Sequence, residues 1–207
     1  AALVLLGRME DGDPRWYYQS TYFDALNSVT IDDLKAYAKY LAKQPSDSLE
    51  SWAWQGACRD PDFYNDIIGT RLLAQARFAD AVPFLEKVSV AFLNKQNIAP
   101  YAAQRSYAQA RWMGKQQVAQ PEYLTEDRRA ALPKLQENKK LSYCRDMLNL
   151  SRQYSLMKPS EERMRKAYEL ASMWYQGSWE GDCWWLTQYG VSVAQDSAMV
   201  GTADFVA

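Results

Sequence analysis

The sequence predicts an all-α fold made of antiparallel helix pairs. Apolar residues recur three or four positions apart in most segments, which is helical spacing. Capping residues and prolines stand at the starts of these segments, and no segment combines strict alternation with the turn signals expected of a β-strand. With 207 residues, the chain is long enough for one large or two small domains with a sizeable core.

The clearest helix pair is centred on residues 65–88. Asp60 and Pro61 mark the start of its first helix, because a carboxylate can cap the free N–H groups and proline is tolerated at the first helical position. After a short break, a second apolar series runs from Phe78 to Val90. One such hairpin cannot bury both of its faces, so it needs a neighbour on each side, as in helical repeat proteins.

Small, aromatic and acidic residues occupy set positions of this hairpin. These positions are Gly69, Ala76, Phe78, Asp80, Ala81, Leu85 and Val88. In this pattern the segment resembles a tetratricopeptide repeat, although Asn65 and Leu72 stand where that family usually has aromatic residues. The resemblance implies an αα-hairpin repeat array that forms a right-handed superhelix, with small residues where two helices approach closely.

The wider sequence resembles a second group of proteins. The stretches ALNSVTIDDLKAYAKYL, DFYNDIIGTRLLAQARFADAVPFLEKVS and GDCWWLTQYG are similar to large uncharacterised cell-envelope proteins of the Bacteroidetes. This likeness covers most of the chain. It implies a location in the cell envelope, either periplasmic or associated with the outer membrane, and it implies no activity.

Further helices are expected on both sides of the central hairpin. They cover residues 3–9, 15–27, 31–43, a stretch from 46 or 48 to 57, 100–113, 141–158, 161–180 and 183–194. Thr30 and Ser160 precede acidic first turns and are expected to act as N-caps. Helical spacing places Leu49 and Trp52 on an inward face, and Tyr168 in the apolar stripe of its helix.

The expected helices group into two sets of repeats. The N-terminal set covers residues 1–113 and includes the tetratricopeptide-like hairpin 61–93, and the C-terminal set covers 141–207. A connector over residues 114–140 lies between them. Residues 114–120 are expected to be an exposed or disordered loop, and the strongly charged residues 122–140 a solvated helical segment that Pro133 interrupts. The alternative is a single continuous domain that includes all three parts.

Composition excludes several kinds of chemistry. The chain has no histidine, so it cannot form a histidine-based zinc site or a catalytic triad that uses histidine as the base. Its net charge of -1 argues against a nucleic-acid partner, and no apolar run approaches the length of a transmembrane segment. We therefore expect no metal, no cofactor and no enzymatic activity in this chain.

The three cysteines, Cys58, Cys144 and Cys183, lie far apart and form no metal-binding motif. Cys183 stands before a tryptophan at an expected helix start, which resembles the nucleophile segment of papain-like proteases. A helix start could lower the pKa of this thiol. Without a histidine to act as its base, the expected role of Cys183 is an inert thiol.

Aromatic residues gather near the end of the chain. The candidate partner- or ligand-binding residues are Trp174, Tyr175, Trp179, Trp184, Trp185 and Tyr189. Such side chains pack in cores, but they also dominate protein interfaces and stack on sugar rings. Trp184 and Trp185 are adjacent, so they cannot lie on the same face of a helix.

These observations favour a non-enzymatic helical-repeat scaffold that binds a protein or peptide. The evidence is the succession of hairpins, the lack of a recognisable catalytic constellation and the number of aromatic residues. The alternative is a module of the cell envelope that binds a glycan or another small ligand through the tryptophan–tyrosine cluster.

Overall fold

The structure is a computed structural model, and it describes residues 4, 18, 20–55, 58–110, 114, 116 and 131–189. Its helices are α2 (Thr21–Ser28), α3 (Ile31–Leu41), α4 (Ser48–Trp54), α5 (Pro61–Ala74), α6 (Phe78–Leu85), α7 (Val90–Leu93), α8 (Ala99–Ala103), α10 (Lys139–Leu156), α11 (Glu161–Gln176) and the 3-10 helix η4 (Trp184–Leu186). These residues contain no β-strand, so the prediction of an all-α fold is confirmed for the described part of the chain. The expected helix over 3–9 lies outside that part, except for the buried Val4.

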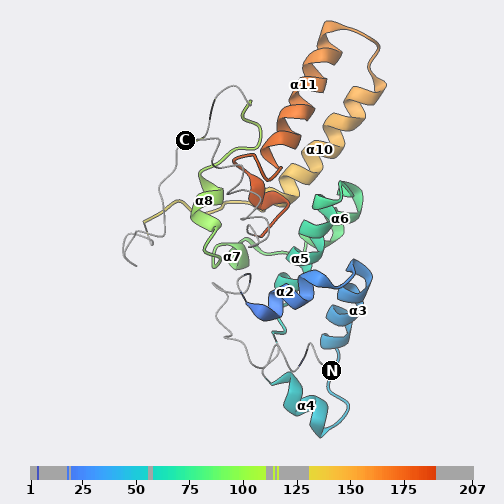
Figure 1. Cartoon of the computed structure of the whole chain (residues 1–207), viewed down its shortest axis with the longest axis vertical. Coiled ribbons are helices and arrows are strands. Elements are labelled where there is room, and N and C mark those ends of the chain that lie inside the picture. Colours follow the sequence, from blue (N-terminus) through green and yellow to red (C-terminus); the bar gives the residue numbers. More distant parts are fainter. Residues whose placement is uncertain are drawn as a thin grey trace, which may run out of the picture.

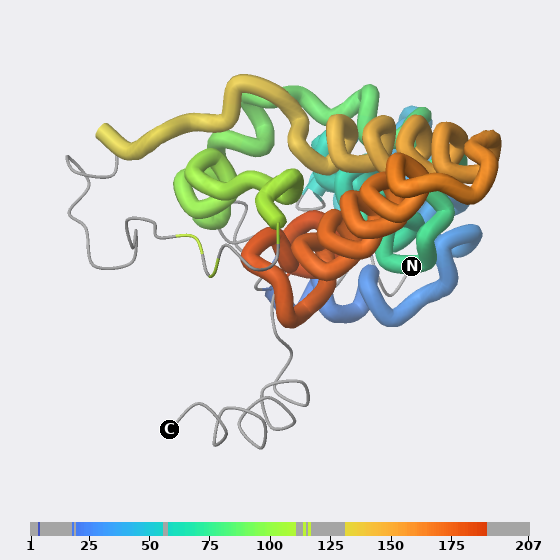
Figure 2. The backbone as a smooth tube through the Cα atoms, turned by 90° about the horizontal axis from the view of Figure 1, so that it is seen from above, coloured from blue at the N-terminus to red at the C-terminus, as the bar shows by residue number. Residues whose placement is uncertain are grey.

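The helices form a continuous stack of neighbours. Helix α3 packs against α5, α5 against α6, α6 against α10, and α10 against α11. Figure 1 shows this order from the lower to the upper end, with α4 at one extreme and the α10–α11 hairpin projecting at the other. The short helices α7 and α8 lie beside the stack in both views, which places them next to the start of α10 and the segment after α11 (Figures 1 and 2).

The central hairpin begins and turns where the sequence indicates. The Asp60 side chain accepts a hydrogen bond from the N–H of Asp62, and Pro61 occupies the first turn of α5. The turn between α5 and α6 contains Ala76 with a φ of 58°, a left-handed conformation that non-glycine residues rarely adopt. A Cβ atom added to Gly69 would lie 2.5 Å from Leu85 Cδ2, so glycine is what allows α5 and α6 to approach this closely.

Two helices end earlier than expected, and side chains at the start of α10 contact both ends. Helix α6 stops at Leu85, whose carbonyl oxygen accepts a hydrogen bond of 3.0 Å from Asn138 Nδ2. Helix α8 stops at Ala103, whereas the spacing predicted a helix to 113. Lys139 Nζ donates to three carbonyl oxygens at that end of α8, and such capping satisfies the carbonyls that a helix terminus leaves free.

The expected final helix over 183–194 is also shorter than predicted. The described part contains only η4, and residues 190–194 lie outside it. The N–H of Cys183 donates to the carbonyl oxygen of Gln176, and the hydroxyl of Thr187 donates to the carbonyl oxygen of Gly177. These contacts fold the segment back against the end of α11, so it does not continue as a helix.

Several apolar residues that the sequence placed inward are exposed. Leu49 and Trp52 of α4 are exposed, whereas the neighbouring Trp54 is buried in edge-to-face contact with Tyr40. In the same way, Tyr168 of α11 is exposed. Helical spacing finds an apolar stripe, but only a neighbouring element decides whether that stripe is covered.

The end of the expected connector is not helical before Lys139 and is buried at a few positions only, which corrects the helical part of the prediction of a solvated helical segment. The described residues 131–138 are not helical, and they lead into the N-cap residue of α10, Asn138. Leu135, Asn138 and Lys140 are all buried. None of the helices in the described part of the chain has both the length and the apolar character needed to cross a bilayer.

Candidate functional site

A pocket lies between the middle of the stack and the segments beside it. Its volume is about 80 Å³. The described residues that line it are Tyr18, Asp66, Leu93, Gln96, Asn97, Ile98, Ala102, Leu135, Asn138, Lys139, Lys140, Trp184, Trp185, Gln188 and Tyr189. The pocket therefore joins α5, the region of α7 and α8, the start of α10 and the segment that follows α11.

The structure divides the six predicted aromatic residues between two places. Trp184, Trp185 and Tyr189 line the pocket. The other three, Trp174, Tyr175 and Trp179, belong to α11 or to the turn after it and do not line the pocket. Only three of the six predicted residues therefore share the pocket.

The adjacent residues Trp184 and Trp185 diverge, as expected for neighbours in a helical turn. Trp185 is buried, whereas Trp184 is half-buried and its Nε1 donates to the hydroxyl of Tyr101 over 3.3 Å. Both residues nevertheless line the pocket.

A buried ion pair forms the floor of the pocket. Lys140 Nζ lies 3.0 Å from Oδ1 and 2.9 Å from Oδ2 of Asp66, and it donates a third hydrogen bond of 2.8 Å to the hydroxyl of Thr70. Both charged side chains are almost fully buried. Burial lowers the pKa of Lys140, and the charge of Asp66 opposes that shift, so the carboxylate is what keeps the ammonium in this environment.

Two tyrosines complete the hydrogen bonding of Asp66. The Tyr18 hydroxyl donates to Asp66 Oδ2 over 2.7 Å, and the Tyr189 hydroxyl lies 2.9 Å from the same oxygen and 2.8 Å from the hydroxyl of Thr70. The two rings stack with centroids 4.2 Å apart, and Lys140 Nζ lies 4.5 Å from the centre of the Tyr189 ring. Burial and the negative charge of Asp66 raise the pKa of both tyrosines well above its usual range.

This network connects residues that are far apart in the sequence. Asp66 and Lys140 are separated by 74 positions, and Asp66 and Tyr189 by 123. Sequence reasoning did not identify Asp66, Tyr18 or Lys140 as site residues. The available signal was a carboxylate next to Ile67 and Ile68, in a helix that has apolar residues on most sides.

The cysteines near the site are not activated. Burial raises the pKa of Cys183 to about 12, and the nearby Lys139 offsets this only in part. Burial also raises the pKa of Cys144 to about 12, and its Sγ donates to the carbonyl oxygen of Phe78. The hypothesis that a helix start lowers the pKa of Cys183 is therefore wrong, because desolvation is the larger effect.

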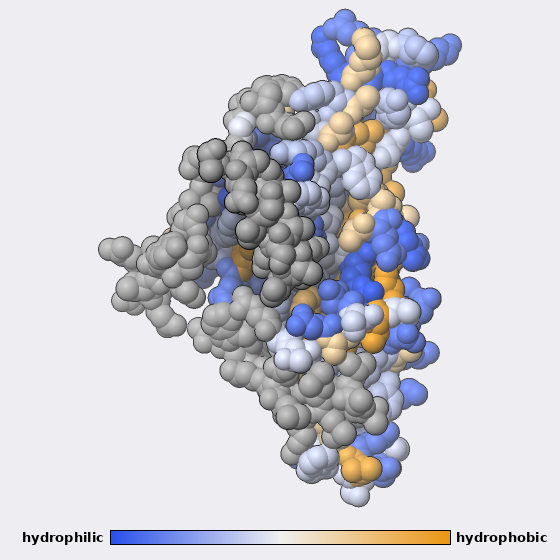
Figure 3. All heavy atoms as spheres, viewed as in Figure 1, coloured by the Kyte–Doolittle hydropathy of each residue, from blue (hydrophilic) through white to orange (hydrophobic). Residues whose placement is uncertain are grey.

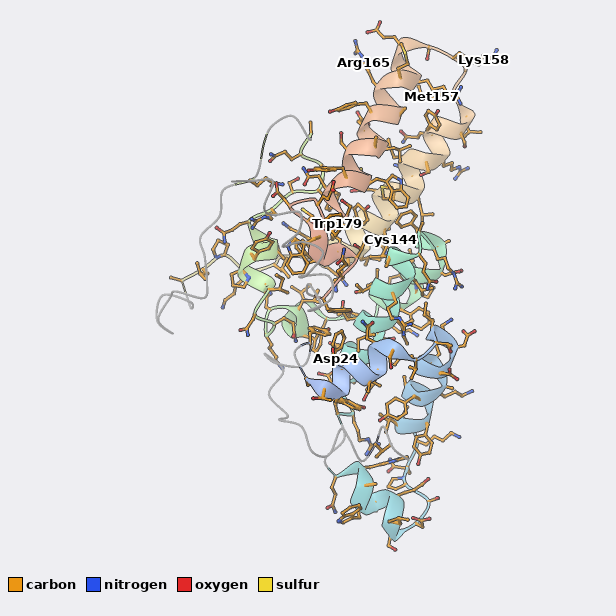
Figure 4. All side chains as sticks on the ribbon, in the orientation of Figure 1. Asp24, Cys144, Met157, Lys158, Arg165 and Trp179 are labelled. Carbon is orange, nitrogen blue, oxygen red and sulfur yellow. The ribbon has the colours of Figure 1, made fainter. Side chains whose placement is uncertain are left out.

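Exposed apolar side chains gather on the projecting hairpin. The described part of the chain has eight exposed large hydrophobic side chains, and five of them lie on α10 and α11: Leu148, Leu156, Met164, Tyr168 and Trp174. Trp179, which follows α11, is also exposed. Figure 3 shows hydrophobic atoms between hydrophilic ones along this end of the molecule, and Figure 4 places Met157 at its tip and Trp179 near its base.

Trp174 lies where the projecting hairpin meets the stack. Its ring contacts that of Phe78 with centroids 5.4 Å apart and an interplanar angle of 63°. Tyr175 is half-buried on the adjacent position of α11. The exposed apolar side chains of α11 therefore continue, through Trp174, to the first residue of α6.

The described residues contain no group of three or more histidine, cysteine, aspartate or glutamate side chains that could hold a metal ion. A scan against protein-family models, a search of curated proteins and a search of solved structures each found no match for this chain.

Proposed function

We propose that this chain is a non-enzymatic helical scaffold that binds a protein partner on the projecting α10–α11 hairpin. The observation that carries this proposal is the concentration of exposed apolar side chains on that hairpin. A soluble surface rarely gathers large apolar side chains in one place unless something covers them. Trp, Tyr and Met are also the residue types that are enriched at protein interfaces.

The spacing of these side chains favours a helical partner segment. Met164, Tyr168, Ala171 and Trp174 occupy positions i, i+4, i+7 and i+10 of α11, and all four are exposed. This spacing gives a stripe along one face of a helix, and such stripes pack against a second helix. We therefore propose that the partner contributes an amphipathic helix or a peptide that becomes helical on binding.

The architecture is compatible with a repeat scaffold. The α5–α6 and α10–α11 hairpins are neighbours through α6 and α10, and Gly69 allows the close approach expected from the tetratricopeptide resemblance. We propose a superhelical repeat array of this kind, with the exposed face of its last described hairpin as the binding surface. The cell envelope is the proposed location, and only the sequence resemblance supports it.

A photo-crosslinking experiment tests the binding surface. A photoreactive phenylalanine analogue replaces Tyr168 in one version of the protein and Trp52 in a control version. The two positions are a matched pair, because both are aromatic and their exposed fractions are 44% and 47%. In an extract of cells that produce the protein, we expect a defined crosslinked partner from position 168 and none from position 52.

The partner found in this way then serves in a binding measurement with purified proteins. We expect Met164→Asp to weaken the Kd by about tenfold or more, because a charge would be buried at the interface. Leu49→Asp is the control, since Leu49 is equally apolar and exposed but lies on α4. The same crosslinks from both positions, or equal affinities of the two variants, would refute the proposed surface.

A further inference from the structure

Apolar and aromatic residues form much of the wall of the pocket. Leu93, Ile98 and Leu135 line it, together with Trp184 and Tyr189. Leu93 and Leu135 are buried, and Ile98 packs against the core. Apolar atoms that face an empty space lose their dispersion contacts, and apolar cavities take up apolar molecules in preference to water. These walls therefore favour an apolar occupant.

The shape of the pocket is fixed by bonds within the protein. Lys140 and Asp66 bind each other, which joins the start of α10 to α5. Nζ of Lys139 donates to three carbonyl oxygens at the end of α8. Asn138 caps α10 and also donates to the carbonyl oxygen of Leu85 at the end of α6. The lysines, the aspartate and the asparagine all line the pocket, so its walls are held in place before a ligand enters.

The pocket reaches the molecular surface, and it is small. Asn97, Trp184 and Gln188 line it and are only half-buried, so a molecule can enter while its polar end stays in water. The volume of about 80 Å³ is roughly half that of the ~150 Å³ apolar cavity that encloses benzene. The space therefore suits a group of roughly three or four carbon atoms.

We infer that the pocket binds the aliphatic end of a small molecule, with roughly three or four carbon atoms inside the pocket and the polar end at the surface. Among the described residues, none that belongs to α11 lines the pocket. The pocket is thus a second binding site, and its ligand is selected by the size of an apolar group. This function does not depend on the protein-binding surface proposed for the hairpin.

The test uses a series of alcohols that differ only in the apolar group: ethanol, 1-propanol, isobutanol and cyclohexylmethanol. The full chain is labelled with nitrogen-15 at its tryptophan indoles. The signals of Trp184, Trp185 and Trp179 are assigned with variants in which each is replaced by phenylalanine. Trp184 and Trp185 line the pocket and report on binding, whereas Trp179 is exposed, does not line the pocket and is the control.

We expect isobutanol to shift the indole signals of Trp184 and Trp185 in a saturable way and to leave that of Trp179 unchanged. The affinity should rise about fourfold for each carbon from ethanol to isobutanol, because each carbon buries further apolar surface. Cyclohexylmethanol should bind at least about tenfold more weakly than isobutanol, because its ring exceeds the space available. An affinity that continues to rise to cyclohexylmethanol, or equal shifts at all three tryptophans, would overturn the proposal.

A matched pair of variants on α8 tests the position of the ligand. Ala102 lines the pocket, and Ala102→Leu adds a branched aliphatic side chain at its wall, so we expect the saturable shift to disappear. Ala103 is the neighbouring residue and does not line the pocket, and Ala103→Leu should leave the affinity for isobutanol unchanged. Unchanged binding by a folded Ala102→Leu variant would refute this site. If that variant fails to fold, the alcohol series on the native protein decides alone.

Discussion

The α5–α6 and α10–α11 hairpins have the same connectivity but very different surroundings. Helix α5 buries nine of its 14 residues, whereas α11 buries three of its 16. Helix α5 has α3 on one side and α6 on the other, and α6 in turn packs against α10. In the described part of the chain, α10 is the main helical neighbour of α11. A hairpin with neighbours on both sides becomes core, while one at the end of a stack keeps an apolar face available.

The same contrast separates the two halves of α10. Its first half carries Lys140, Tyr143 and Met147, all buried at the base of the projecting hairpin. Its second half carries Leu148 and Leu156, which are exposed on the projecting end. One helix thus links a buried polar network to the proposed binding surface, and variants in its two halves should separate stability from binding.

The largest effect is expected from Lys140→Met. This change leaves the buried carboxylate of Asp66 without its counter-charge, and breaking a buried pair in this way typically destabilises a protein by about 3–5 kcal/mol. Urea unfolding followed by circular dichroism measures the change. The added substitution Asp66→Asn should restore part of the lost stability, because the double variant no longer buries an unpaired charge.

The control for this prediction lies on the other hairpin. Arg165 pairs with Glu161 on α11, and both side chains are 75% exposed. We expect Arg165→Met to leave the urea midpoint nearly unchanged, because exposed ion pairs contribute little. Equal urea midpoints for Lys140→Met and Arg165→Met would contradict the contrast between the buried start of α10 and the exposed end of the hairpin.

A pair of methionines gives a second comparison within one hairpin. Met147 of α10 is fully buried, and Met164 of α11 is 67% exposed. Met147→Ala should lower the free energy of unfolding by about 2–5 kcal/mol, through lost burial and the cavity it leaves. Met164→Ala should change it by less than about 0.5 kcal/mol. A large loss for Met164→Ala would mean that its side chain is core, and that the projecting face is not free for a partner.

The elements that the sequence predicted best are those whose signals are local. The start of α5 depends on Asp60 and Pro61, and the start of α11 on the side chain of Ser160, which accepts from the N–H of Arg163. These signals lie within three residues of the boundary they determine. Capping of this kind needs no knowledge of the rest of the fold.

The boundaries that were wrong depend on distant residues. The ends of α6 and α8 coincide with hydrogen bonds from Asn138 and Lys139, which lie 53 and 37 positions from their partners Leu85 and Ala102. No local pattern contains that information. Tertiary contacts override helical spacing at both places.

The candidate site was predicted only in part for the same reason. Aromatic content pointed to Trp184, Trp185 and Tyr189, which do line the pocket. The ion pair of Asp66 and Lys140 was missed, because the two residues meet only when α10 packs against the stack. Periodicity also cannot tell which apolar face has a neighbour, so Tyr168 was placed in a stripe that the structure leaves exposed.

The smallest expected effect is a pH dependence of stability, and it concerns Cys183 in the segment that follows α11. The pKa of Cys183 is about 12 in the folded protein and near 9 when the chain is unfolded. A raised folded pKa means that its contribution is fully present below about pH 9 and is lost as the pH rises towards 12. Between about pH 8 and 10, Cys183→Ala should therefore lose about 1 kcal/mol less stability than the native protein. Met147→Ala is the control, since it leaves a cavity without removing a titrating group and should show the full alkaline loss. If Cys183→Ala and the native protein lose the same stability over this pH range, the thiol is hydrated and the segment after α11 does not pack into the core.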